Sequence, residues 1–327
     1  MRIFSHAPQD DVALRSEARA FATQLRGVLP SDAWLRSLTA ERGVDFSAAT
    51  LYESLLLHPI HGGFAAQIDS LAPPRKAGPG PDATLVVVPG LVWEDYPQLG
   101  SDGQLVMDVA RRSGFTPCRV PVDGRGTSSN NARVIVSFLD RLETNDAWLL
   151  SLSKGSADLR YAMSGTFGEF PWGKVSGWIN VCGSPNGSDL AARLTGSPWR
   201  RLGARAMCLA SRIPFDAMLE ISARHPLWSR PINFPNHFRA ISVVGLPMRW
   251  HVSDTLSSRH RMLSPLGPND GVVLCMNAFV SPGLIYPLWG HDHYFRGPGI
   301  VPLLYRLFAF LRTAAAPAEQ EARRLAM

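Results

Sequence analysis

The chain has 327 residues, of which 46% are hydrophobic and 18% are charged. These values are typical of a globular protein with a sizeable core, and the length suits one large α/β domain with insertions or two smaller domains. The net charge of +6 arises from 33 basic against 27 acidic residues. Basic residues such as Arg111, Arg112, Arg200 and Arg201 are scattered and form no continuous stripe, so we expect no nucleic-acid partner.

The N-terminal segment has no apolar stretch like that of a secretory signal, and acidic residues begin at Asp10. Both features argue against a secretory signal. No segment approaches the ~18 uninterrupted apolar residues of a membrane span. Four cysteines lie far apart without CxxC spacing, which predicts buried thiols and no disulfide or zinc framework. These cysteines are Cys118, Cys182, Cys208 and Cys275. We therefore expect a cytoplasmic protein without a membrane span.

Residues 1–72 are expected to form an N-terminal helical extension. Apolar residues recur there at helical spacing, Ser31 is suited to cap a helix over 32–39, and a third helix is expected over 51–57. The role of these helices is left open between packing beside the main domain, forming a homodimer and adding stability. The Pro/Gly-rich segment 73–83 is predicted to be a linker, because neither helix nor sheet continues through such a sequence.

From residue 84 onward, short apolar runs alternate with helical patterns. The apolar runs show little polar alternation, which is typical of strands covered by helices on both faces. The expected strands are 84–88, 116–122, 147–152, 175–182, 240–246 and 284–288, and the expected helices are 104–113, 131–142, 155–164 and 300–313. Residues 187–237 predict a helical insert, and a Pro-rich loop is expected up to residue 271. The series predicts an α/β fold with a mostly parallel sheet and helices on both faces.

The most informative serine, Ser153, lies where an expected strand passes directly into a helix. Ser151 and Gly155, two positions on either side, are small enough for a tight turn. Such a turn holds a hydroxyl clear of the sheet at a helix N-terminus, whose dipole favours a developing oxyanion. The pattern is S-x-S-x-G, in which Ser151 replaces the first glycine of G-x-S-x-G. Because serine and glycine also serve as helix caps, this motif alone is weak.

Longer motifs around Ser153 resemble the α/β-hydrolase superfamily and, within it, bacterial lipases and esterases. Residues 153–161 (SKGSADLRY) resemble the H-S-x-G-G-x-x-x-R-Y stretch of those lipases. Residues 181–191 (VCGSPNGSDLA) resemble their G-T-P-H-x-G-S loop, with Asn186 where histidine is usual. The matches span about residues 84–296. The resemblance implies the α/β-hydrolase fold for a catalytic domain over 84–327, with the insert of about 187–237 as its lid.

The resemblance also implies a Ser–Asp–His triad, because in this fold the acid and the base follow the serine in chain order. Asp270 lies in an N-D-G-x-V segment that resembles the one carrying the acid, and Asp254 and Asp292 are the alternatives. His293 aligns with the base in G-x-D-H-[FY]-F, and His291 is the alternative base. The H-x-H pair would also suit a metal, but no second ligand cluster accompanies it, so we expect no metal and no cofactor.

The strand ending in Val-Val-Pro-Gly suggests where an oxyanion would be held. The main-chain N–H groups of Leu91 and Lys154 are the predicted donors, and the Lys154 side chain is expected to lie in solvent. Four aromatic residues near this loop or in the insert are expected to contact the substrate. These residues are Trp93, Tyr96, Trp199 and Phe215.

The function predicted from these motifs is hydrolysis of a carboxylic ester, lactone or thioester of a small metabolite through an acyl-enzyme. Two alternatives remain at this point. The same triad would support an acyltransferase or cyclase if water were excluded, and the fold would also suit a non-catalytic ligand-binding protein with a relic of the active site.

Overall fold

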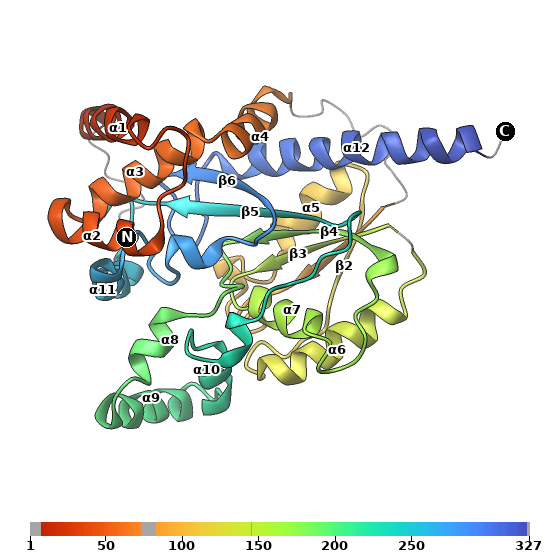
Figure 1. The fold of residues 1–327 in the computed structure, drawn as a ribbon. Helices are drawn as coiled ribbons and strands as arrows, with labels where there is room; N and C mark the ends of the chain where they lie inside the picture. The colour runs from red at the N-terminus through yellow and green to blue at the C-terminus, as the bar shows by residue number, and fades with distance from the viewer. Residues whose placement is uncertain (1–7, 73–82, 145, 326–327) are drawn as a thin grey trace.

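The computed structural model describes residues 8–72, 83–144 and 146–325 (Figure 1). Within these residues one sheet of six parallel strands has the order β2-β1-β3-β4-β5-β6. The strands are β1 (Thr84–Val88), β2 (Thr116–Arg119), β3 (Ala147–Leu152), β4 (Val175–Val181), β5 (Arg239–Leu246) and β6 (Leu284–Trp289). The parallel sheet confirms the predicted fold class. The predicted linker 73–83 lies, apart from Ala83, outside the described residues.

Helices precede the sheet, connect its strands and follow it. They are α1 (Pro8–Thr23), α2 (Asp32–Arg42), α3 (Val44–Leu57), α4 (Pro59–Ser70), α5 (Gln104–Arg112), α6 (Ser128–Asp140), α7 (Gly155–Met163), α8 (Asp189–Leu194), α9 (Pro198–Ala210), α10 (Phe215–Ile221), α11 (Asp254–Leu263) and α12 (Ile300–Leu325). None of the described helices has both the length and the apolar composition needed to cross a membrane.

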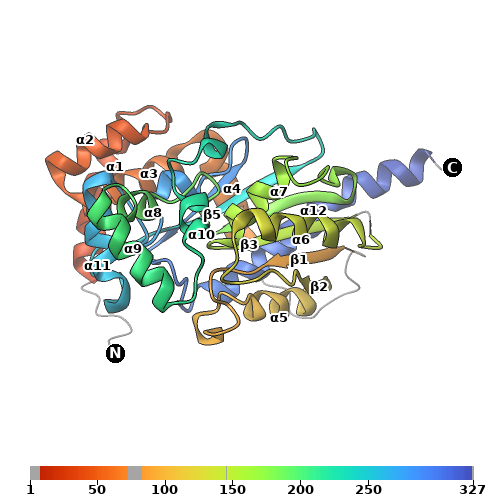
Figure 2. The ribbon, with the colours of Figure 1, turned by 90° about the horizontal axis from the view of Figure 1, so that it is seen from below.

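Helices cover both faces of the sheet because its strands are apolar on both sides. Successive side chains of a strand point to opposite faces. Leu85 and Val87 of β1 therefore pack with α4, α5 and α12, whereas Val86 and Val88 pack with α6 and α7. Figure 1 shows the strands between α4 and α12 above and α6 and α7 below, and in Figure 2, seen from below, α6 and α7 lie in front of the sheet. The strands all end on one side of the sheet, toward which the arrows of Figure 1 point.

The N-terminal helices share the core of the sheet. Leu51 and Leu55 of α3 pack against Leu246 of β5 and Ile285 of β6. Helix α1 is tied to the loop after β5 and to the end of β6 through Asp11, which accepts hydrogen bonds from the indoles of Trp250 (2.8 Å) and Trp289 (3.1 Å). These contacts place α1 next to the segment that leads into the H-D-H motif.

The expected loop before residue 271 is partly wrong, because α11 occupies Asp254–Leu263. Its buried side chains, Leu256, His260 and Leu263, recur at intervals of four and three residues, as on one face of a helix. The sequence predicted a loop here because the helical pattern is short and has prolines on both sides.

Candidate active site

Ser153 lies at a strained turn between β3 and α7. Its φ of +49° falls in the left-handed region, which costs a non-glycine residue roughly 1–3 kcal/mol unless the surroundings hold it there. Gly155 makes this turn possible, because a Cβ at this position would lie 2.5 Å from the carbonyl oxygens of Val88 and Pro89. The turn has the geometry of a nucleophile elbow.

Ser151, which replaces the first glycine of the motif, is part of a buried hydrogen-bond chain beneath the turn. Its Oγ accepts from Trp178 Nε1 at 2.7 Å and lies 2.8 Å from Ser156 Oγ. Ser156 in turn donates to Asn180 Oδ1 at 2.6 Å, so Ser151 is the donor to Ser156. Both hydroxyl groups in this hydrogen-bond network, those of Ser151 and Ser156, thus have partners. Ser151 is therefore held by this network at the position where the motif usually has glycine.

A hydrogen-bonded chain joins Ser153, His293 and Asp270. Ser153 Oγ lies 2.9 Å from His293 Nε2, and His293 Nδ1 lies 2.9 Å from Asp270 Oδ2. The other oxygen of Asp270 accepts from the N–H groups of Val272 (2.9 Å) and Val273 (2.7 Å). An ionised carboxylate only accepts hydrogen bonds, so Nδ1 carries the proton and Nε2 is free to accept the serine proton. This is the arrangement of a Ser–His–Asp triad.

The alternative acids and the alternative base are directed elsewhere. Asp292 accepts from the N–H groups of Ser253 (2.9 Å) and Tyr294 (3.1 Å), and Asp254 is exposed at the start of α11. His291 Nδ1 lies 2.8 Å from the carbonyl oxygen of Trp289, and burial lowers the pKa of this imidazole. The two histidines of the H-x-H motif therefore do not converge on one point.

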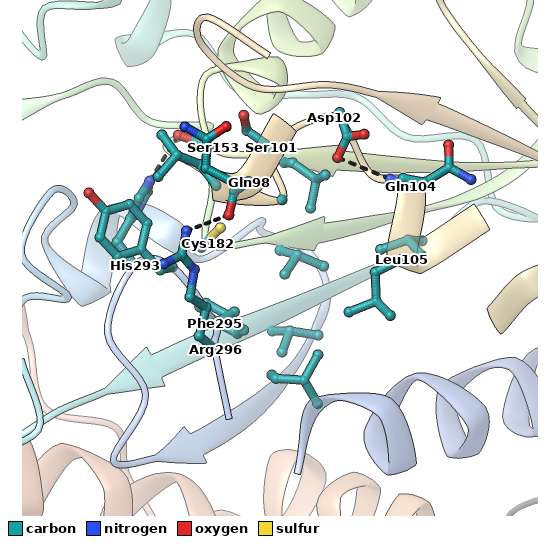
Figure 3. Close-up of a pocket in the computed structure, with 18 of the residues that line it drawn as sticks. Gln98, Ser101, Asp102, Gln104, Leu105, Ser153, Cys182, His293, Phe295 and Arg296 are labelled. Carbon is teal, nitrogen blue, oxygen red and sulfur yellow. Dashed lines mark hydrogen bonds between the residues drawn. The ribbon is translucent and has the colours of Figure 1, made fainter. Parts of the chain in front are cut away.

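A cavity of about 780 Å³ opens beside Ser153 and His293 (Figure 3). Ser153 and His293 line it at the carboxyl ends of the strands, and Leu105 lies across it. It extends between the sheet, α5 and α12, where its wall is apolar. That part of the wall consists of Leu105, Val106, Leu152, Val181, Val243, Ile300, Leu303, Leu304 and Leu307. A largely apolar cavity with a few convergent polar groups is the usual form of a small-molecule site.

Backbone strain is concentrated around the same cavity. Six described non-glycine residues have a positive φ, and four of them line it. These four are Val92 (+49°), Ser153 (+49°), Cys182 (+46°) and Phe295 (+50°). Positive φ is a genuine outlier for a β-branched residue such as Val92. Strained residues persist where the surrounding structure holds them, and they cluster at functional sites.

Comparison with solved structures agrees with this architecture. The metagenomic carboxyl esterase MGS0156 superposes with a TM-score of 0.57 at 19% identity, over 76% of this chain and 80% of that one. The mature lipase BlEst2 of Bacillus licheniformis superposes with a TM-score of 0.50 at 20% identity, over 71% of this chain and 96% of that one. The chain has the α/β-hydrolase fold. No protein-family model matches the sequence, and no curated protein matches it either.

Two main-chain N–H groups, those of Leu91 and Lys154, are the predicted oxyanion donors. Gly90 N–H donates to the Ser101 carbonyl (2.8 Å) and Val92 N–H to that of Gly124 (3.0 Å), which holds the loop after β1 on both sides of Leu91. Within the described part of the chain, the N–H groups of Leu91 and Lys154 have no acceptor. Both belong to the residues predicted to hold the oxyanion, and donors left free in this way are available to a ligand.

The side chain of Lys154 is buried, and the expectation that it lies in solvent is wrong. Its ammonium contacts both carboxylate oxygens of Asp158 at 2.8 and 2.9 Å. Asp158 also accepts from Ser128 Oγ (2.6 Å) and Asn131 Nδ2 (2.7 Å). The i,i+4 spacing on α7 and the neighbouring start of α6 bring these groups together. The pair anchors the start of α7 to the start of α6.

Of the four aromatic residues expected at the substrate, only Tyr96 lines this cavity among the described residues. Trp93 turns its indole to the carbonyl oxygen of Val122 (3.1 Å), Trp199 is exposed on α9, and Phe215 lies under two arginines of α9. Trp93, Trp199 and Phe215 are therefore not among the described residues that line this cavity.

The predicted insert 187–237 is helical and lies between β4 and β5, but none of its described residues lines the cavity. The wall comes instead from the loop after β1, α5, α11 and α12. Arg296, next to the cavity mouth, donates to the carbonyl oxygen of Gln98 at 2.6 Å and so links the loop after β1 to the segment after His293 (Figure 3). The sequence pattern of α5 and α12 predicted buried faces and could not distinguish a cavity wall from core.

Proposed function

We propose that this protein is a serine hydrolase that cleaves carboxylic esters through an acyl-enzyme. The observation that carries the proposal is the chain from Ser153 through His293 to Asp270, which starts at a strained elbow and opens into an apolar cavity. The fold it shares with a carboxyl esterase and a lipase supports the same reaction class.

In the first half-reaction, Ser153 Oγ attacks the ester carbonyl carbon while its proton passes to His293 Nε2. The carbonyl oxygen becomes an oxyanion, which accepts hydrogen bonds from the N–H groups of Leu91 and Lys154. The bond to the alcohol oxygen then breaks, and His293 donates the proton to that oxygen. Asp270 stabilises the imidazolium that exists between these two transfers.

In the second half-reaction, water attacks the acyl carbon of the Ser153 ester. His293 removes a proton from this water, and the acyl–Oγ bond then breaks with the proton returning to Ser153. The carboxylic acid leaves and the free enzyme is restored. The apolar wall of α5 and α12 suits the hydrocarbon part of an ester, whose burial provides binding free energy.

Labelling with a fluorophosphonate probe, which reacts with activated serines, tests the proposal. We expect Ser153 to be labelled and the Ser153→Ala variant to remain unlabelled. The matched control is Ser101→Ala, because Ser101 lines the same cavity and its Oγ has no partner among the described residues. Equal labelling of wild-type protein and the Ser153→Ala variant would refute the proposed nucleophile.

Turnover of p-nitrophenyl esters tests the base. Loss of a triad serine or histidine lowers kcat by about 10⁶-fold in a well-studied serine protease. We expect a loss of similar scale for Ser153→Ala and His293→Ala and less than tenfold for His291→Ala. If His291→Ala abolished turnover while His293→Ala kept it, the base assignment would be wrong.

An acyltransferase instead of a hydrolase would be revealed by ester products that form when acceptor alcohols are added.

A further inference from the structure

Helix α9 presents large apolar side chains to the outside of the protein. Its buried residues, Ala204 and Cys208, are small and lie one turn apart, so only a narrow stripe faces the body. The exposed apolar residues of the helix are Trp199 (81%), Leu202 (61%), Met207 (46%) and Leu209 (82%). Isolated exposed apolar residues are common on protein surfaces, but a contiguous group on one short helix marks an interaction site.

These side chains form one continuous apolar face. At roughly 100° per residue, Trp199, Leu202, Met207 and Leu209 fall within an arc of about 160°. The arc lies opposite the buried stripe, and only alanine and glycine fill its remaining positions. Arginines flank the arc on both sides: Arg200 follows Met207 on one side, and Arg205 lies beyond Pro198 on the other.

The charge around this face has a single sign. Between Asp189 and Asp216 the chain contains five arginines and no acidic residue. In the described part of the chain, no carboxylate forms an ion pair with Arg200, Arg201 or Arg205. These cations are therefore available to an anionic partner.

Two of the arginines stand beside a surface hollow. The guanidinium groups of Arg201 and Arg205 lie 5.9 and 5.1 Å from the centre of the Phe215 ring. Phe215 is the first residue of α10, so these contacts join the two arginines of α9 to the next helix. Together with Pro198, Trp199 and Leu202 they line a shallow hollow. An apolar floor next to paired guanidinium groups matches a lipid with an anionic headgroup, since Arg binds phosphate through two parallel hydrogen bonds.

We propose that α9 docks this protein on membrane surfaces that contain anionic phospholipids. The helix lies in the interface with its apolar face among the upper acyl chains and its arginines at the headgroup phosphates. A second copy of the chain fits this face less well, because docking it would bring two sets of unpaired arginines together.

The position of α9 suits a fixed anchor. It forms the lower left corner of the molecule in Figure 1 and lies in the foreground of Figure 2, at the end of the molecule toward which the strands point. The Ser153 turn follows the carboxyl end of β3 at that same end. No residue of α9 lines the cavity, and its apolar face is already exposed, so docking requires no opening of the helix.

Flotation of the full chain with lipid vesicles tests the proposal. We expect binding to vesicles of phosphatidylcholine with about one third phosphatidylglycerol, and at least about tenfold weaker binding to phosphatidylcholine alone. Two triple variants separate the contributions: one removes the apolar face and the other the charges. They are Trp199→Ser/Leu202→Ser/Leu209→Ser and Arg200→Gln/Arg201→Gln/Arg205→Gln.

The apolar variant should lose at least about tenfold in affinity for both kinds of vesicle, because burial of these side chains drives insertion. The arginine variant should lose its preference for the anionic vesicles. Control variants carry the same kinds of substitution, at two positions each, on other surfaces and should bind as wild type does. They are Val28→Ser/Ile60→Ser, at comparably exposed apolar residues, and Arg111→Gln/Arg112→Gln.

Thermal unfolding shows whether the variants are folded, and the single change Trp199→Ser serves if the triple variant is not. Failure of the wild-type chain to bind anionic vesicles would overturn the proposal, as would unchanged binding by the folded apolar variant. A wild-type dimer that becomes monomeric on Trp199→Ser would assign the face to a second copy and would overturn it too. Ester turnover in solution is independent of these results.

Discussion

Replacing Lys154 with Met is predicted to destabilise the protein strongly. This lysine follows the proposed nucleophile, and its side chain was expected to lie in solvent. Its ammonium and the Asp158 carboxylate are both buried and lie 2.8 Å apart. Lys154→Met keeps most of the length of the side chain and, among the described residues, leaves the Asp158 carboxylate with the side chains of Ser128 and Asn131 as partners. Breaking a buried pair in this way costs about 3–5 kcal/mol.

A double-mutant cycle measured by urea denaturation tests this magnitude. Asp158→Asn alone should also cost several kcal/mol, because it leaves a buried ammonium without its carboxylate. The double variant should recover most of the loss, since it removes both charges and keeps an amide near Ser128 and Asn131. The matched control is Arg36→Met, which breaks the exposed i,i+4 pair with Asp32 and should cost less than about 1 kcal/mol.

The reasoning would be refuted if Lys154→Met and Arg36→Met cost the same, or if the two effects at Lys154 and Asp158 were additive. Either result would mean that the two buried side chains do not depend on each other. The anchor between the elbow helix and the start of α6 would then have to be sought elsewhere.

Three further changes have defined outcomes. Ser151→Gly restores the usual glycine but leaves Trp178 Nε1 buried without an acceptor, so urea denaturation should show a loss of about 1–3 kcal/mol; equal stability would contradict the network. Asp11→Ala removes the acceptor of two indoles, and hydrogen exchange across α1 should accelerate; unchanged exchange would show that α1 is held by other contacts. The pKa of His61 is lowered from 6.5 to about 4, mainly by burial and to a smaller extent by the charge of His58. As pH falls, His61 is protonated in the unfolded chain before it is protonated in the folded protein. The free energy of unfolding therefore decreases as pH falls from 6.5 toward 4. His61→Phe should remove up to about 3 kcal/mol of this acid sensitivity, measured by denaturation at pH 7 and pH 4, and an equal pH dependence would contradict it.

The sequence by itself determined the elements of the sheet and the order of the catalytic candidates. The predicted strands 84–88 and 147–152 coincide with β1 and β3, because strands buried on both faces need continuous apolar runs that few other segments have. Ser153 was identified for a similar reason, since a strand that turns directly into a helix through small residues is a local pattern. Local patterns are legible because they depend on neighbours in the chain.

Only the tertiary structure decided which side chains meet. Ser153 and His293 are 140 residues apart, and whether His293 or His291 reaches Ser153 depends on the path of the chain after β6. Lys154 is buried because the start of α6 approaches it, and Trp199 is exposed because α9 contacts the body through two small residues. Side-chain type and spacing cannot specify these contacts, since each depends on how elements distant in sequence pack together.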